Sequence, residues 1–118
     1  VLYMKRSNNE QNLLVAAVFP VTVDAFVQFQ NRARETLGQK GIEFIVFSAE
    51  GDPTRFHSIL DLAIKRKPNV LIMVGTQLTN IGLGSRYSNY KGAVIASCIS
   101  DPEKVEALKK IGIDNPYQ

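Results

Sequence analysis

The segment from Asn69 to Gln77 constrains the fold of this chain more than any other stretch of its sequence. Its apolar run from Val70 to Val74 shows no alternation of apolar and polar residues. A strand of this kind is buried on both faces, which is typical of a parallel sheet that lies between two layers of helices. Further apolar runs at 13–19, 42–49 and 93–99 predict more strands of the same sheet.

Helical signals follow each of these runs. In the two clearest helices, apolar residues recur at helical spacing: Phe26, Phe29, Ala33 and Leu37 in the first, and Phe56, Ile59, Leu60, Ala63 and Ile64 in the second. Asp52 and Pro53 form the start signal of the second helix. Gly82 and Gly84 interrupt the third helix, which we expect to be short or irregular.

A fourth helix is predicted to begin at Ser100-Asp101-Pro102-Glu103. Alternating strands and helices of this kind predict a doubly wound α/β fold, with one parallel sheet of four strands and helices on both faces. We expect residues 1–12 to form a polar lead-in and residues 13–118 to form a single α/β lobe.

Polar residues stand where each predicted strand gives way to a helix. They are Thr22, Asp52, Thr76, and Ser100 with Asp101. In doubly wound sheets ligands bind beyond the carboxyl ends of the strands, so we expect these residues to share one edge. Gly75 allows a sharp turn or a close approach to a ligand, and Thr76 can cap the helix that follows. Helix capping alone explains Asp52, whereas ligand binding is the favoured explanation for Thr76 and Asp101.

The sequence offers no support for several chemistries. No Gly-x-Gly-x-x-Gly turn follows the first run, and the ends of the first and third runs lack the carboxylates of a phospho-acceptor domain. The single histidine, His57, and the single cysteine, Cys98, are too few for a zinc site. We expect His57 to lie at or near the surface and Cys98 to be a buried structural thiol. Neither Cys98 nor Ser100 has the neighbouring base of a nucleophile, so we expect no catalysis and no cofactor.

The charge of the chain does not indicate a nucleic-acid partner. Its net charge of +3 is spread along the sequence, apart from Lys65-Arg66-Lys67 and Lys109-Lys110. The first cluster fits a solvated helix end, where the helix dipole favours cations. No apolar segment approaches the roughly 20 residues of a membrane helix. The residues from Val1 to Met4 leave three alternatives open, namely the remnant of a signal sequence, a membrane anchor and a frayed polar terminus.

The order of four landmarks resembles the first lobe of ABC-transporter solute-binding proteins, in particular the tryptophan/tyrosine-type components. The landmarks are Phe19-Pro20 with Asp24, Glu50-Gly51-Asp52-Pro53, Pro68-Asn69-Val70 leading to Val74-Gly75-Thr76, and Ser100-Asp101-Pro102. The resemblance extends from Leu13 to Leu108. It implies one lobe of a type I periplasmic-binding-protein-like fold in a periplasmic or extracytoplasmic receptor, with a lipoprotein anchor among the possibilities. Such a receptor delivers an amino acid, often aromatic, to a membrane permease.

The resemblance also implies which residues contact the ligand. The ligand's carboxylate would meet Gly75, Thr76 and Gln77. Its ammonium would meet Asp101, next to Ser100. The wall of the cleft would include Phe19, Pro20, Thr22 and Asp24. A zwitterion needs an anion site and a carboxylate close together, and adjacent strand ends can supply both.

The sequence departs from this family after Ile111, where a glycine-rich crossover into a second lobe is usual. We therefore expect a second lobe or a second copy to complete the cleft, and weak or undetectable ligand binding by this chain alone. Two other hypotheses stay open at this point. One is a sensory or protein-interaction module of the same fold, and the other is a small α/β enzyme with shifted pKa values at the strand ends.

Overall fold

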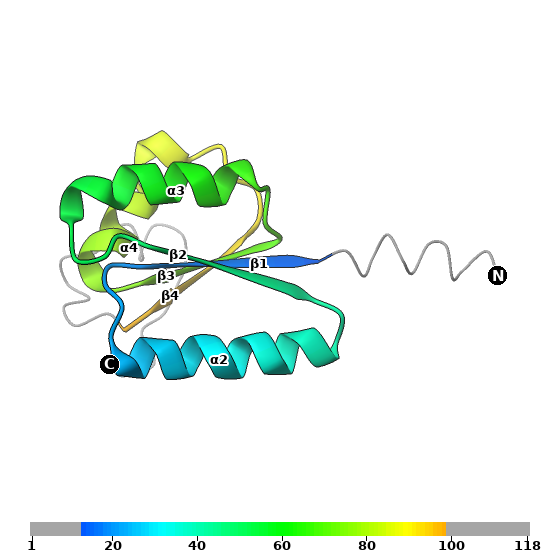
Figure 1. Ribbon diagram of the computed structural model, residues 1–118. Coiled ribbons are helices and arrows are strands. Elements are labelled where there is room, and N and C mark those ends of the chain that lie inside the picture. The colour runs from blue at the N-terminus through cyan, green and yellow to red at the C-terminus, as the bar shows by residue number, and fades with distance from the viewer. Residues whose placement is uncertain (1–12, 99–118) are drawn as a thin grey trace, which may run out of the picture.

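The computed structural model describes residues 13–98, which fold into one parallel sheet with helices on both sides (Figure 1). In chain order the elements are β1 (Leu14–Phe19), α2 (Asp24–Gln39), β2 (Glu43–Ser48), the 3-10 helix η1 (Pro53–Arg55), α3 (Phe56–Lys65), β3 (Val70–Val74), α4 (Thr76–Gly82), the 3-10 helix η2 (Ser85–Tyr87) and β4 (Ala93–Ser97). The predicted α/β class and the parallel sheet of four strands are confirmed. The predicted fourth helix, with Ser100 and Asp101, lies outside the described residues.

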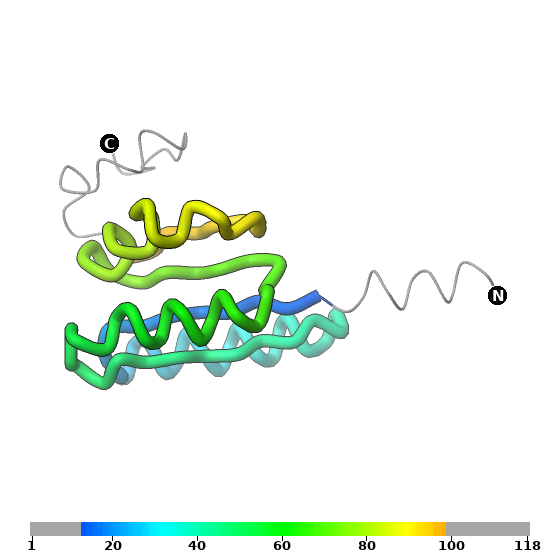
Figure 2. The backbone as a smooth tube through the Cα atoms, turned by 90° about the horizontal axis from the view of Figure 1, so that it is seen from above, coloured from blue at the N-terminus to red at the C-terminus, as the bar shows by residue number. Residues whose placement is uncertain are grey.

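The strands are arranged in the order β2-β1-β3-β4, and every neighbouring pair is parallel. The register places Ala17 of β1 opposite both Val46 of β2 and Ile72 of β3. α2 covers one face of the sheet, and α3 and α4 cover the other (Figure 1, Figure 2). The chain therefore reverses its direction of travel between β1 and β3, where doubly wound sheets open a crevice at their carboxyl edge.

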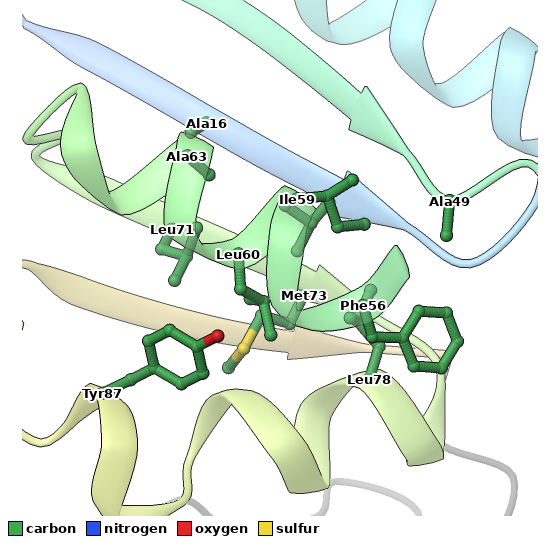
Figure 3. Packing of buried hydrophobic residues seen from close by; sticks show 11 residues of the cluster. Ala16, Ala49, Phe56, Ile59, Leu60, Ala63, Leu71, Met73, Leu78 and Tyr87 are labelled. Atoms are coloured by element: carbon green, nitrogen blue, oxygen red, sulfur yellow. The ribbon is translucent and has the colours of Figure 1, made fainter. Parts of the chain in front are cut away.

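The core on the side of α3 and α4 combines alternate residues of the central strands with the apolar stripe of α3. Its labelled members in Figure 3 are Ala16, Ala49, Phe56, Ile59, Leu60, Ala63, Leu71, Met73, Leu78 and Tyr87. Gly82, which weakens α4 as a helix, lies close to the core, because a Cβ atom at this position would overlap the sulfur of Met73 and displace that side chain. The same glycine therefore favours close packing of α4 on β3.

The core on the side of α2 is thinner. The ring centroid of Phe19 lies 5.3 Å from that of Phe26 and 6.0 Å from that of Phe29, so these rings join the end of β1 to α2. No residue of α2 is fully buried, and Phe29 remains 40% exposed. The helix thus shields one side of the sheet with only part of its predicted stripe.

The last strand does not meet the expectation that every strand is buried on both faces. β4 lies at the edge of the described sheet, and Ile95 is 49% exposed. The reason is that α2 packs against β2 and the end of β1, on the other half of the sheet. The expectation of a buried Cys98 is wrong as well. Its thiol is exposed because the chain has already left the sheet at this residue.

Candidate functional site

The four strands end at one edge of the sheet because all of them are parallel. Residues 20–23 follow β1, residues 49–52 follow β2, Gly75 follows β3 and Cys98 follows β4. We refer to these residues as the carboxyl-edge loops. Their convergence is the arrangement on which the predicted binding site depends.

A cluster of polar side chains joins the first two of these loops. The Thr22 hydroxyl oxygen lies 3.2 Å from Ser48 Oγ and 3.1 Å from Glu50 Oε1. Ser48 Oγ also accepts the backbone N–H of Glu50 over 3.1 Å. The hydroxyl of Thr22 is therefore used between loops and does not cap α2, whose preceding residue Val23 makes no side-chain cap.

Backbone hydrogen bonds hold the same two loops together. The N–H of Ala49 donates to the carbonyl of Phe19 over 3.0 Å, and the N–H of Gly51 donates to the carbonyl of Pro20 over 2.8 Å. Glu50 lies between these two donors with a φ of 54°, a left-handed conformation that is costly for a residue with a side chain. The loop after β2 is thus fixed against the loop after β1.

Gly75 occupies the turn between β3 and α4. Its φ is 94°, and its N–H donates to the carbonyl of Ser97 over 2.8 Å, which ties β3 to the end of β4. A Cβ atom at Gly75 would lie 3.5 Å from Pro20 Cγ, so the turn after β3 lies next to the turn after β1. The expectation that Thr76 caps α4 is wrong, because Gly75 is the N-cap and Thr76 is already the first helical residue.

Residues with a positive φ follow three of the four strands at this edge. Gly51 and Gly75 adopt this conformation without strain, whereas it is costly for Glu50 after β2 and Cys98 after β4. Residues held in such conformations are enriched at ligand-binding sites, where the surrounding structure keeps them in place.

The residues predicted to bind a ligand differ in their access to solvent. Pro20 and Thr76 are half-buried, whereas Thr22, Asp24 and Gln77 are exposed. Phe19 is 0% exposed, so it supports the wall from behind and does not face solvent. The structure therefore brings Pro20, Thr22 and Gly75 to one edge of the sheet, while Ser100 and Asp101 lie outside the described residues.

Acidic side chains outnumber basic ones in and next to the carboxyl-edge loops. Glu50 and Asp52 of these loops are exposed, and so is Asp24, the first residue of α2. The Asp52 carboxylate accepts the N–H of Thr54 over 3.0 Å and its hydroxyl over 2.7 Å, and these hydrogen bonds lower the pKa of Asp52. Asp52 is therefore an N-cap, as predicted, and the element that it caps is the 3-10 helix η1. Glu50 and Asp24 remain to attract a cationic group.

Ser48 and Glu50 were not among the predicted site residues. Ser48 ends β2 and Glu50 follows it in the next loop, and only the order β2-β1-β3-β4 shows that these residues lie next to the loop after β1. Consecutive strands are usually neighbours in a sheet, so the sequence could have predicted that the loops after the first two strands lie side by side.

Between residues 13 and 98 no group of three His, Cys, Asp or Glu side chains is placed to hold a metal ion. The same part of the chain contains no helix with the length and apolar character needed to span a membrane. Comparisons with protein families, with curated proteins and with solved structures found no match to this chain.

Proposed function

We propose that this chain is a non-catalytic ligand-binding lobe that forms one wall of a cleft for a small amine-bearing solute. The class we propose is the solute-binding component of an ABC transporter for amino acids, aromatic ones in particular. The observation that carries the proposal is the pair of turns that lie side by side at the switch point, with Pro20 next to Gly75 between β1 and β3.

This position supports ligand binding for a geometric reason. At a switch point the connections on either side lead away to opposite faces of the sheet, and doubly wound sheets bind their ligands beyond the strand ends at this point. Here one of these turns also carries the Thr22 hydroxyl, which contacts Glu50 of the next loop. This edge of the sheet thus carries polar groups that hydrogen bonds hold in position.

The charges at this edge favour the ammonium group of a ligand. Glu50 and Asp24 supply negative charge next to the switch point. The ligand's carboxylate would be bound by the backbone at Gly75, Thr76 and Gln77 together with groups from the opposite wall. In this proposal the opposite wall comes from a second lobe or a second copy, and the permease receives the ligand outside the cytoplasm.

The proposal includes weak binding by the lone lobe. A charge pair that remains exposed to water contributes about 1 kcal/mol or less, whereas closure between two walls excludes water and adds contacts. We therefore expect dissociation constants in the millimolar range, near an interaction free energy of about 4 kcal/mol.

A nuclear magnetic resonance titration tests this function. Phenylalanine, phenethylamine and 3-phenylpropionate share a ring but differ in their charged groups, and each is added to ¹⁵N-labelled protein. We expect phenylalanine and phenethylamine to shift the amide signals of residues 20–24, 48–51 and 75–77, and 3-phenylpropionate to leave them unchanged.

Two variants with the same change of charge make the test specific. Glu50→Gln should abolish the shifts caused by phenethylamine, whereas Glu35→Gln, on the exposed surface of α2, should not. Shifts that are absent from the carboxyl-edge loops, or equal in the two variants, would contradict the proposed site. Tight binding of phenylalanine by a proven monomer would contradict the argument that one wall is missing.

A further inference from the structure

An open hollow lies at the opposite, amino edge of the sheet, away from the carboxyl-edge loops. It has a volume of about 750 Å³ and lies between the end of α3, the segment around η2 and the starts of β3 and β4. An adjoining hollow of about 450 Å³ shares Ile64, Tyr87, Tyr90 and Gly92 with it. We refer to both together as the amino-edge hollow. Each of the two volumes is in the range of small-molecule sites.

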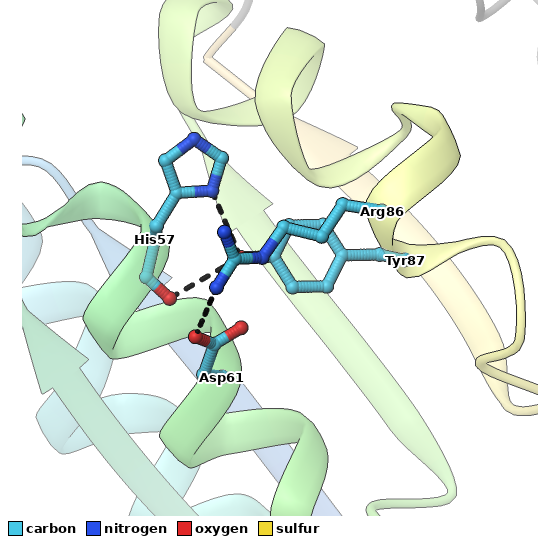
Figure 4. Close-up of polar contacts among 4 residues, drawn as sticks. All are labelled: His57, Asp61, Arg86 and Tyr87. Atoms are coloured by element: carbon cyan, nitrogen blue, oxygen red, sulfur yellow. Dashed lines mark hydrogen bonds and ion pairs between the residues drawn. The ribbon is translucent and has the colours of Figure 1, made fainter.

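Two tyrosines form much of the apolar wall, and the hydroxyls of both are already hydrogen bonded. The Tyr87 hydroxyl donates to the carbonyl of His57 over 3.2 Å and lies 3.1 Å from His57 Nδ1 (Figure 4). The Tyr90 hydroxyl donates to the carbonyl of Pro68 over 2.8 Å. Gly92 permits this arrangement, because a Cβ atom there would overlap the Tyr90 hydroxyl. The protons of both phenols are thus engaged. Tyr90 is half-buried and supplies the accessible ring surface, whereas Tyr87 is buried and has the Arg86 guanidinium 5.7 Å from its ring centroid.

The charged side chains that line the hollow are all basic. They are Lys67, Arg86 and Lys91, and no aspartate or glutamate is among the lining residues. Arg86 is paired with Asp61 over 2.7 Å on the outer side of α3 (Figure 4). Lys67 and Lys91 have no acidic partner within the described part of the chain. At least two positive charges therefore remain uncompensated at the hollow.

The side-chain amide of Asn69 adds a hydrogen-bond donor to the hollow. The side-chain oxygen of Asn69 accepts the N–H of Leu14 over 2.9 Å, which leaves the amide group of Asn69 as a donor. Lys67 has a φ of 54°, a left-handed conformation that is costly for a residue with a side chain. A site with positive charge and an amide donor beside an aromatic ring favours an anion with a flat apolar body.

We propose that the amino-edge hollow binds small organic anions that carry a flat apolar body, with the apolar body against Tyr90 and the anionic group near Lys67 and Lys91. The site is separate from the proposed amino-acid cleft and does not depend on it. Either site can be present without the other.

Fluorescence with a pair of probes tests the proposal. The anion 1-anilinonaphthalene-8-sulfonate and the neutral N-phenyl-1-naphthylamine share an aromatic body and differ in the sulfonate. We expect the anion to bind more tightly than the neutral probe, and its affinity to fall at least about fivefold in the Lys67→Gln/Lys91→Gln double variant, as expected from about 1 kcal/mol of lost attraction. The neutral probe should be unaffected by these substitutions.

The control is Lys40→Gln/Lys65→Gln, which removes the same charge from exposed lysines outside the hollow. This variant should retain the affinity of the unmodified chain for the anion. Amide shifts caused by the anion should map to residues 67–69 and 86–93. Equal losses in the two double variants, equal binding of the two probes, no binding of the anion, or shifts that map to Ile95 or to the carboxyl-edge loops would each overturn the proposal.

Discussion

The Thr22 hydroxyl oxygen lies 3.1 Å from the Glu50 carboxylate, although the two residues follow different strands and are 28 positions apart. The contact is possible because β1 and β2 are parallel neighbours, so their loops leave the sheet side by side. The hydroxyl thereby holds in place one of the carboxylates that we assign to the ligand's ammonium. Stability and ligand binding should therefore share this contact.

Replacing Thr22 by valine removes the hydroxyl and keeps the shape of the side chain. We expect the free energy of unfolding to fall by about 0.5 to 1 kcal/mol, the net contribution of an exposed hydrogen bond. Urea denaturation measures this change. Thr36→Val is the matched control, because Thr36 is an exposed threonine of α2 outside the cluster. Equal effects of the two substitutions would show that the Thr22 contact contributes nothing.

The turn at Gly75 should tolerate no side chain without a loss of stability. Its φ of 94° is unfavourable for any L-residue with a Cβ atom, so we expect Gly75→Ala to lower the free energy of unfolding by about 1 to 2 kcal/mol. The Cβ atom itself would only reach ordinary contact with Pro20, so the cost is in the backbone. Urea denaturation again provides the measurement.

Gly38→Ala is the control with the opposite sign. Gly38 lies in the last turn of α2, and nothing is within 4 Å of a Cβ atom built there. Alanine should stabilise the helix by up to about 1 kcal/mol, because it is the better helix former. Destabilisation at both glycines, or at neither, would contradict the conformational explanation.

The two leucines of α3 provide a test of the core. Leu60 is 0% exposed and Leu62 is 53% exposed, although they are two positions apart in one helix. We expect Leu60→Ala to destabilise the protein by about 2 to 5 kcal/mol, since it leaves a cavity against Met73. Leu62→Ala should change stability by less than about 0.5 kcal/mol. Similar effects in thermal or urea denaturation would mean that α3 faces the sheet differently.

Much of the fold could be predicted because local and tertiary signals agree. The run Val70–Val74 has no polar face, and it forms a central strand buried on both sides. In α3 the apolar stripe alone decides which face meets the sheet. β4 carries a similar apolar run, yet Ile95 is exposed because β4 is at the edge of the described sheet and α2 lies elsewhere. Strand order is a tertiary property that the run itself does not encode.

The candidate site was less predictable for the same reason. The convergence of strand ends follows from a parallel sheet, but the contact of Thr22 with Ser48 and Glu50 depends on which strands are neighbours. Capping preferences also led to a wrong prediction at Thr76. Threonine is a good N-cap residue, but the N-cap of α4 is Gly75 and the helix begins at Thr76. Tertiary packing thus decides between residues that the sequence alone makes equivalent.

Cys98 should react readily in the folded protein. Its thiol is exposed, and it is the single cysteine of the chain. We expect a maleimide reagent to label the native protein at a rate close to that in urea, because access and not unfolding limits the reaction. Mass spectrometry of timed samples measures the two rates. Labelling that requires urea would show that another part of the protein covers Cys98.

Tyr87 should make stability sensitive to alkaline pH. Burial, with a further contribution from the neighbouring Asp61, raises the pKa of Tyr87 from 10.0 to about 12. The folded protein therefore binds the phenolic proton more tightly than the unfolded chain does, so this contribution is complete below pH 10 and is lost as pH rises towards 12. Urea denaturation across this window should show a steeper fall of unfolding free energy in the unmodified protein than in Tyr87→Phe, by at most about 1.4 kcal/mol per pH unit. Lysines also lose their protons in this pH range, but they are the same in both proteins and do not affect the difference between the curves. Parallel curves would mean that Tyr87 ionises at the same pH in the folded and unfolded states.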